Sequence, residues 1–234
     1  MKVRLIILSC IIFLFSCNKD EFNQEDFHIG FYKPTKYEIQ KARLFSKHGE
    51  VKDTYKIADY AKRNKIRFIL SNVLTPIEEQ EPSQIELFDN KTAIITHYNQ
   101  KHYRDILKKD SYIYLESRAF GSYPEEIRNQ EPSIFDFLKH KPLSESEPVS
   151  RPTGNVIFNK HCFYVKADKN IIRMPILEYD YRGFETIDIN EGSKSKYGFG
   201  KFNINNEFNL DVLNYLTDND TVIIRESNII YERQ

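Results

Sequence analysis

The 234-residue sequence has no tryptophan, only three cysteines and no excess of either charge. Lysine and arginine number 34 in total, and so do aspartate and glutamate. A neutral chain without a basic run creates no field that would attract a polyanion, so we expect no nucleic-acid partner. The lack of tryptophan also weakens any prediction of a sugar-stacking platform, because such platforms usually use that residue.

The sequence also lacks the short motifs that identify common enzyme classes. It has no Gly-x-Ser-x-Gly elbow, and its histidines and cysteines do not have the spacing of a zinc site. Gly198-Phe199-Gly200 lacks the third glycine of a dinucleotide-binding loop. His161 and Cys162 are neighbours, and adjacent residues on a strand point to opposite faces, so they should not form a catalytic pair. We therefore assign no catalytic, metal-binding or cofactor-binding residue and expect no cofactor.

The N-terminus carries the longest apolar run of the chain. Lys2 and Arg4 precede the apolar stretch 5–15, and the small residue Ser16 stands before Cys17. A membrane-spanning helix needs about 20 apolar residues, so this stretch is short for an anchor. A basic start, an apolar centre and a small residue are the three parts of a signal peptide. We predict that residues 1–16 are a signal peptide, cleaved between Ser16 and Cys17.

The residues around the predicted cleavage site, Leu14-Phe15-Ser16-Cys17, resemble the lipobox of bacterial lipoproteins. The resemblance implies that the Cys17 thiol receives a diacylglycerol and that further acylation with chains such as palmitate anchors the protein. Ile7-Leu8-Ser9-Cys10 also fits the pattern, but the apolar run before it is too short. An ordinary cleaved signal and an uncleaved anchor are the alternatives. Cys162 would then be the last unmodified cysteine, which excludes an intramolecular disulfide and favours a buried thiol.

The polar stretch after Cys17 suggests where the anchored protein is exported. Lys19, Asp20 and Glu21 resemble the surface-export tag of lipoproteins from Bacteroidota-type bacteria. Residues 17–26 are too polar to fold and are predicted to be a lipidated tether. We expect a lipid anchor in the outer membrane, with the cell surface and the periplasmic face as the two alternatives.

The remaining residues, 27–234, are predicted to form a single α+β domain of mostly antiparallel β-sheet with two to four short helices. Asp53 is suited to cap a helix that follows it, and Asn206 or Asn209 to cap a second helix ending near Tyr215. Pro175 should lie at a strand edge or bulge, because proline cannot donate to a ladder. The strands are expected in these segments: 28–32, 41–46, 66–70, 85–88, 93–97, 111–116, 156–158, 161–166, 170–181, 221–224 and 228–231.

Prolines concentrate in the middle of the chain. Five of the nine lie in residues 119–153, where Ile134–Lys139, with Ser133 as a cap, is the only predicted helix. A connection of this length is a linker, a lid-like insertion or a misread element. As a linker it would separate two lobes, 27–118 and 154–234.

The conspicuous excess is aromatic: 15 tyrosines and 17 phenylalanines. Tyrosine is common both at binding surfaces and in the packing of sheets, and packing is the simpler explanation. The first functional hypothesis is a non-enzymatic binding or interaction module with a protein or glycan ligand. The alternative is a lipid-anchored hydrolase with a site in or under the 119–153 segment. An immunity or inhibitor protein is a third option.

Overall fold

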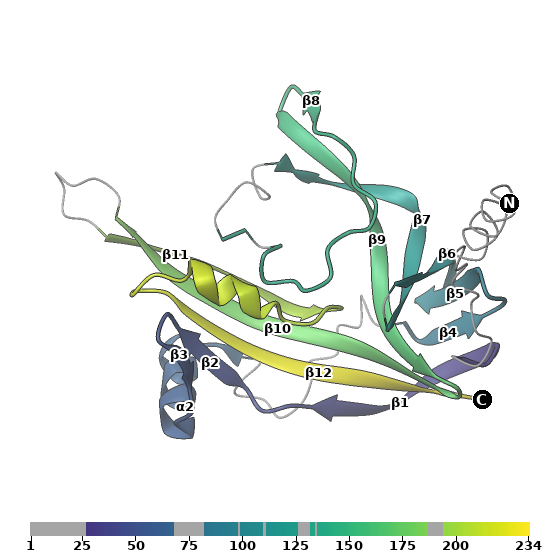
Figure 1. Ribbon diagram of the computed structural model, residues 1–234, viewed down its shortest axis with the longest axis horizontal. Coiled ribbons are helices and arrows are strands. Elements are labelled where there is room, and N and C mark those ends of the chain that lie inside the picture. The colour runs from purple at the N-terminus through teal and green to yellow at the C-terminus, as the bar shows by residue number, and fades with distance from the viewer. Residues whose placement is uncertain are drawn as a thin grey trace, which may run out of the picture.

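The computed structural model describes residues 27–67, 82–97, 99–109, 111–125, 132–133, 135–186 and 194–234. Within a sheet of twelve strands, eight antiparallel strands close into a barrel (Figure 1). In ring order these are β10 (Ile171–Thr186), β9 (Gly154–Asp168), β7 (Tyr112–Pro124), β6 (Gln100–Lys109), β5 (Thr92–His97), β4 (Gln84–Leu87), β1 (Gly30–Ile39) and β12 (Thr221–Arg233). The ring closes because β12 pairs with β10 as well as with β1.

Four further strands are added to this ring. They are β11 (Lys194–Ile204) beside β10, β2 (Arg43–Ser46) beside β12, β3 (Gly49–Val51) beside β2, and β8 (Val149–Arg151) beside β9. The described residues add one α-helix, α2 (Thr54–Arg63), and one 3-10 helix, η2 (Leu210–Tyr215). Neither helix in this part of the chain is long and apolar enough to cross a membrane.

The prediction of an α+β domain with several short helices is wrong, because the structure is essentially all-β. One reason is β6, which was missed because its sequence, QKHYRDILKK, is dominated by charged and polar residues. Both edges of this strand are hydrogen-bonded, to β5 and to β7, and only alternate residues enter the barrel. Another reason is the predicted helix Ile134–Lys139. Residues 135–137 form turns, and the Asp136 carboxylate accepts a hydrogen bond from the Ser133 N–H at 2.7 Å.

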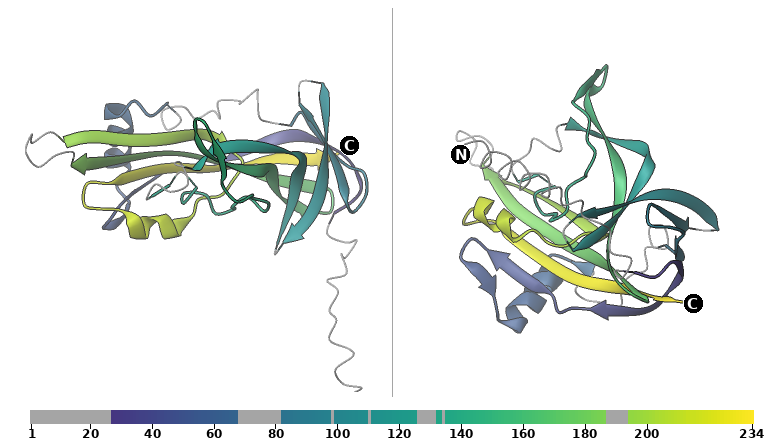
Figure 2. Two further views of the ribbon diagram at one scale, coloured as in Figure 1. Left: turned by 90° about the horizontal axis from the view of Figure 1, so that it is seen from above. Right: turned by 45° about the vertical axis from the view of Figure 1, so that its right-hand side comes forward.

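Two arms extend from the barrel (Figures 1 and 2). In the first, β10 and β12 continue beyond the ring together and carry β11, β2 and β3. In the second, β7 and β9 continue as a pair and carry β8. The proline-rich segment 119–153 begins in β7 and ends around β8, and its residues 135–148 lie between the two arms.

The barrel interior is apolar at the end that holds the turn between β9 and β10, here called the hairpin end. Tyr32, Leu87 and Ile172 are no more than 1% exposed there. Phe27 is packed into the same cluster and forms a bridge to Lys169. The Tyr32 hydroxyl donates to the Lys169 carbonyl oxygen at 2.9 Å, so this end is covered and its polar group is bonded. The opposite end, where the two arms diverge, is here called the open end.

Several local predictions are confirmed and one boundary is corrected. Asp53 caps α2, since its carboxylate accepts from the backbone N–H groups of Tyr55 and Lys56. The predicted hairpin of residues 85–97 is formed by β4 and β5. The first strand was expected to end before Pro34, but β1 continues to Ile39. A register shift between Pro34 and Lys36 accommodates the missing N–H.

Candidate functional site

The opening of the barrel wall begins where β9 and β10 separate. They pair only from Ile171 to Arg173, after which β9 follows β7 and β10 follows β12. Pro175 pairs with Asn228 of β12, but the other edge of β10 has no strand partner at this point, between the end of pairing with β9 and the start of pairing with β11 at Leu177. Proline has no N–H to donate, so its position agrees with the predicted strand edge. The sequence therefore marks the point at which the wall splits.

Two consecutive asparagines hold the split together. The Asn205 amide nitrogen donates to the carbonyl oxygens of Tyr164 and Pro175, at 3.0 and 2.8 Å, and its oxygen accepts from the Tyr164 N–H at 2.5 Å. Asn206 bonds the backbone N–H and carbonyl of His140, each at 2.9 Å. Asn206 thus fixes the proline-rich segment, whereas Asn209 is the residue that caps η2.

A pocket of about 420 Å³ occupies the open end. Its apolar lining includes Phe163, Met174, Ile176 and Ile204, which come from β9, β10 and β11. The proline-rich segment contributes Phe135, Leu138, His140 and Pro142 to the same wall. The pocket therefore lies partly under the segment in which the sequence placed an alternative site.

Arg104, His97 and His161 contribute polar groups to this pocket from the inner face of the barrel, beside the lining residues Asn159, Lys160, Asn205 and Asn206. Arg104 is 9% exposed, its Nη1 donates to the His161 carbonyl oxygen at 3.2 Å, and its guanidinium carbon lies 5.3 Å from the centre of the Phe163 ring. Burial lowers the pKa of Arg104 from its ordinary value. Sequence reasoning missed this residue because β6 was not predicted. The signal that could have revealed the strand is that every second residue, His102, Arg104 and Ile106, lies on the same side of it.

The His161 side chain is neutral near pH 7. Burial, followed by the charges of Arg104 and His97, lowers the pKa of His161 to about 4. His161 is nevertheless an exposed residue, so the lowered pKa reflects the protein atoms that surround the ring on the pocket wall and not a loss of contact with water. The inner face of the open end therefore carries one permanent positive charge, on Arg104, beside an uncharged imidazole.

The outer face of β9 has a different character. Cys162 is buried with Tyr112, Tyr114 and Tyr164, and burial raises the pKa of its thiol to about 12. Both residues are among the lining of the pocket, but His161 contacts Phe163 whereas Cys162 packs with the tyrosines, so they point to opposite faces of the strand as the sequence predicts and the imidazole does not activate the thiol. The buried state expected for Cys162 is confirmed.

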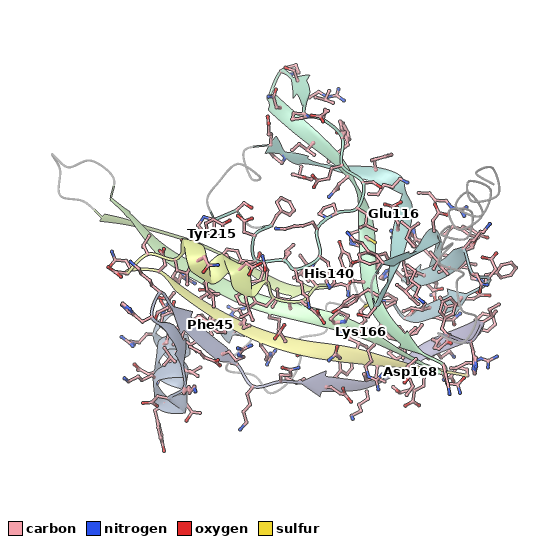
Figure 3. All side chains as sticks on the ribbon, viewed as in Figure 1. Phe45, Glu116, His140, Lys166, Asp168 and Tyr215 are labelled. Carbon is pink, nitrogen blue, oxygen red and sulfur yellow. The ribbon has the colours of Figure 1, made fainter. Side chains whose placement is uncertain are left out.

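His140 connects the proline-rich segment to this tyrosine cluster (Figure 3). Its ring stacks on Tyr164 with the ring centres 4.8 Å apart and an angle of 23° between the planes. It meets Tyr112 edge-on at 4.3 Å, and its Nδ1 lies 3.2 Å from the Tyr114 hydroxyl. These aromatic contacts account for part of the tyrosine excess by packing, the simpler of the two explanations.

Glu207 anchors the same cluster from the other side. Its carboxylate accepts from Lys139 at 2.8 Å, from Lys166 at 2.9 Å and from the Tyr112 hydroxyl. His140 Nε2 lies 3.6 Å from the carboxylate. His140 first, and then Lys139, Tyr112 and Lys166, hold the pKa of Glu207 well below its ordinary value. This network fixes the proline-rich segment against the barrel and forms one rim of the site.

The described residues contain no group of three or more His, Cys, Asp or Glu side chains that could hold a metal ion. Ser16, Cys17, Lys19, Asp20 and Glu21, which carry the predicted cleavage, lipidation and export signals, lie outside the described residues. The same holds for most of the predicted strand 66–70.

Comparison with known proteins adds no functional assignment. No family model matches the chain, and no similar curated protein was found. No solved structure matches the fold either. The pocket at the open end is therefore interpreted from its own chemistry.

Proposed function

We propose that the chain is a lipid-anchored, non-enzymatic binding protein of the outer membrane, whose ligand is a small molecule held in the pocket at the open end of the barrel. The lipobox-like residues that end at Cys17 support the anchor, and Lys19, Asp20 and Glu21 support export to the cell surface. The pocket carries the proposal for the binding function.

The size and lining of the pocket support a small ligand. Its volume of about 420 Å³ falls within the range of roughly 300–1,000 Å³ that is common for small-molecule sites. Such sites combine an apolar wall with a few polar groups, and Phe163, Met174 and Ile176 stand here beside Arg104 and His161. An eight-stranded barrel has room for its own side chains or for one small ligand. The apolar core of this barrel extends from the hairpin end to Phe163, Met174 and Ile176, which form part of the pocket wall.

Binding is favoured over hydrolysis because the pocket lacks an activated nucleophile. Cys162 is the only cysteine among the described residues, and burial raises its pKa to about 12. Catalytic thiols require the opposite shift, toward the thiolate. Both Cys162 and His161 are among the lining residues, but the imidazole contacts Phe163 whereas the thiol packs with the tyrosines on the other side of the strand. No observation therefore favours the hydrolase alternative.

Native mass spectrometry tests the pocket directly. Protein purified from cell envelopes should carry a small molecule that denaturation releases. An Ile176→Trp substitution should fill the pocket and abolish this mass, whereas Leu107→Trp, at a residue that is 40% exposed, should leave it unchanged. Both variants should keep the circular dichroism of a β protein. A wild-type protein that carries no small molecule and takes none from a metabolite extract would contradict the proposal.

The anchor needs a separate test. Mass spectrometry of the mature N-terminus should find an acylated Cys17, and a Cys17→Ala variant should be released from the membrane fraction. Serine in place of Asp20 and Glu21 should leave acylation intact and reduce exposure to protease added to whole cells. An unmodified thiol at residue 17, or retention of residues 1–16, would rule out the lipoprotein assignment.

A further inference from the structure

Arg104 is a buried cation without a counter-ion among the described residues. The other buried arginine, Arg225, forms an ion pair with Glu178 through two hydrogen bonds, at 2.5 and 3.0 Å. Arg104 instead has one hydrogen bond, to the His161 carbonyl, and its Nε has no partner. Arginines are seldom buried so deeply unless they are paired. Arg104 lines the pocket and its Nε is buried there without a partner, so a ligand in the pocket can supply the counter-charge that the guanidinium lacks.

The other charged groups of the pocket do not supply this partner. Lys160, the second permanent cation in the lining, is 3.0 Å from Glu116 and is therefore already neutralised. His161 stays neutral at pH 7, whereas arginine does not lose its proton in proteins. No aspartate or glutamate is among the lining residues. The pocket therefore presents one uncompensated positive charge.

The geometry points to a monocarboxylate with an apolar tail as the ligand. Nη1 donates to the His161 carbonyl and Nε is buried without a partner. A carboxylate that approaches from the Nη2 side would therefore need a small movement of the guanidinium to bond Nε and Nη2 with its two oxygens. The tail would lie against Phe163, Met174 and Ile176. A single negative charge matches the single free cation, whereas a phosphate dianion would bury a second charge without a partner. This inference rests on the proposed small-molecule pocket and specifies its ligand class.

The experiment compares ligands that share one tail. The mature chain, residues 17–234 with Met in place of Cys17, contains every described residue. Displacement of the fluorescent probe anilinonaphthalene sulfonate by octanoate, octan-1-ol and octyl phosphate separates the head-group chemistry from the tail. Octanoate should bind about 10- to 100-fold more tightly than octan-1-ol, the usual effect of a charge-assisted hydrogen bond. Octyl phosphate should bind more weakly than octanoate.

Variants at Arg104 identify the group responsible. Arg104→Gln should reduce octanoate affinity about 10- to 100-fold and leave octan-1-ol affinity nearly unchanged. Arg104→Lys keeps the charge without the two-pronged geometry and should fall in between. Arg118→Gln is the matched control. Arg118 is exposed on neighbouring β7 and paired with Asp105 at 2.9 Å, so octanoate affinity should not change.

Thermal unfolding of the ligand-free protein gives a second readout. An unpaired buried arginine that serves ligand binding should destabilise the ligand-free protein. Arg104→Met should therefore raise the Tm by about 2–4 °C. A purely structural arginine would lower the Tm when replaced. A fall in Tm together with unchanged octanoate binding would therefore overturn the inference.

The binding outcomes separate the two proposals. Equal affinity for octanoate and octan-1-ol would overturn the carboxylate inference and leave the pocket intact as a binding site. Preference for octyl phosphate would also overturn it, in favour of a phosphate ligand. Failure of the probe and of all three octyl compounds to bind would overturn the proposed binding function as well.

Discussion

The two ends of the barrel are built from largely the same strands but bury different chemistry. At the hairpin end, Tyr32, Leu87 and Ile172 fill the interior, and the hydroxyl of Tyr32 is bonded. At the open end, Arg104 has an unpaired nitrogen and His161 lines a pocket. Under the proposed function, folding stability and ligand binding would be carried by different layers of one barrel. Four predictions test this division.

The largest effect is expected at the hairpin end. Leu87 is 1% exposed, so Leu87→Ala should lower the free energy of unfolding by about 2–5 kcal/mol through lost burial and a residual cavity. Chemical denaturation measures this loss. Leu107→Ala, at an exposed position on β6, is the matched control and should change stability by less than about 0.5 kcal/mol. Octanoate affinity of the folded Leu87→Ala protein should stay close to wild type. A large loss of affinity would show that the two ends are coupled.

The rim of the open end should have an intermediate effect. Glu207→Gln weakens the bonds to Lys139, Lys166 and Tyr112 and should cost about 1–3 kcal/mol at pH 7. The pKa of Glu207 is lowered in the folded protein, so its contribution is present above the unfolded pKa and is lost as the pH falls. The stability difference between wild type and variant should therefore shrink in acid. A difference that does not depend on pH would contradict the charge-based role of Glu207.

A smaller effect is expected from His161. Its pKa of about 4 lies below the ordinary 6.5, so the folded state favours the neutral ring. The resulting stability is present above about pH 6.5 and is lost as the pH falls toward 4. NMR titration of the ring should give a midpoint near 4, and His161→Gln should flatten this part of the pH–stability curve. His48→Gln, at an 81% exposed side chain, should not. A His161 midpoint near 6.5 would show that the inner face of the open end does not lower the pKa of this ring.

Almost no effect is expected at Cys162, on the outer face of the same strand. The pKa of its thiol is raised to about 12, so little thiolate exists at pH 8. Iodoacetamide should label the folded protein at least about 100-fold more slowly than protein unfolded in guanidinium. Intact-mass spectrometry follows the reaction. Rapid labelling of folded protein would mean that the outer face of β9 is open rather than packed.

Local patterns in the sequence predicted several elements of this fold but not its closure. The Asp53 cap, the β4–β5 hairpin and the edge position of Pro175 are determined by residues close to them in sequence, so they could be predicted from local patterns. Ring closure depends on β12 pairing with both β10 and β1, which are distant in sequence, and periodicity does not report such pairs. The charged β6 strand was missed for a related reason. Pairing on both edges outweighs its low apolar content.

The candidate site was harder to predict because its parts come from separate strands. The adjacent pair His161 and Cys162 drew attention in the sequence, yet its two members serve opposite faces of β9. Arg104 reaches the pocket from β6, and neither its type nor its neighbours mark it as unpaired. The lack of a counter-ion is a property of the assembled barrel and is not visible in any local motif.

The position of β12 has a consequence for how the protein acquires its shape. This strand lies between β10 on one side and β1 and β2 on the other, and it is the last strand in chain order. The ring cannot close until β12 pairs with strands that precede it in the chain. Folding therefore depends on pairings between residues distant in sequence, which makes it slow.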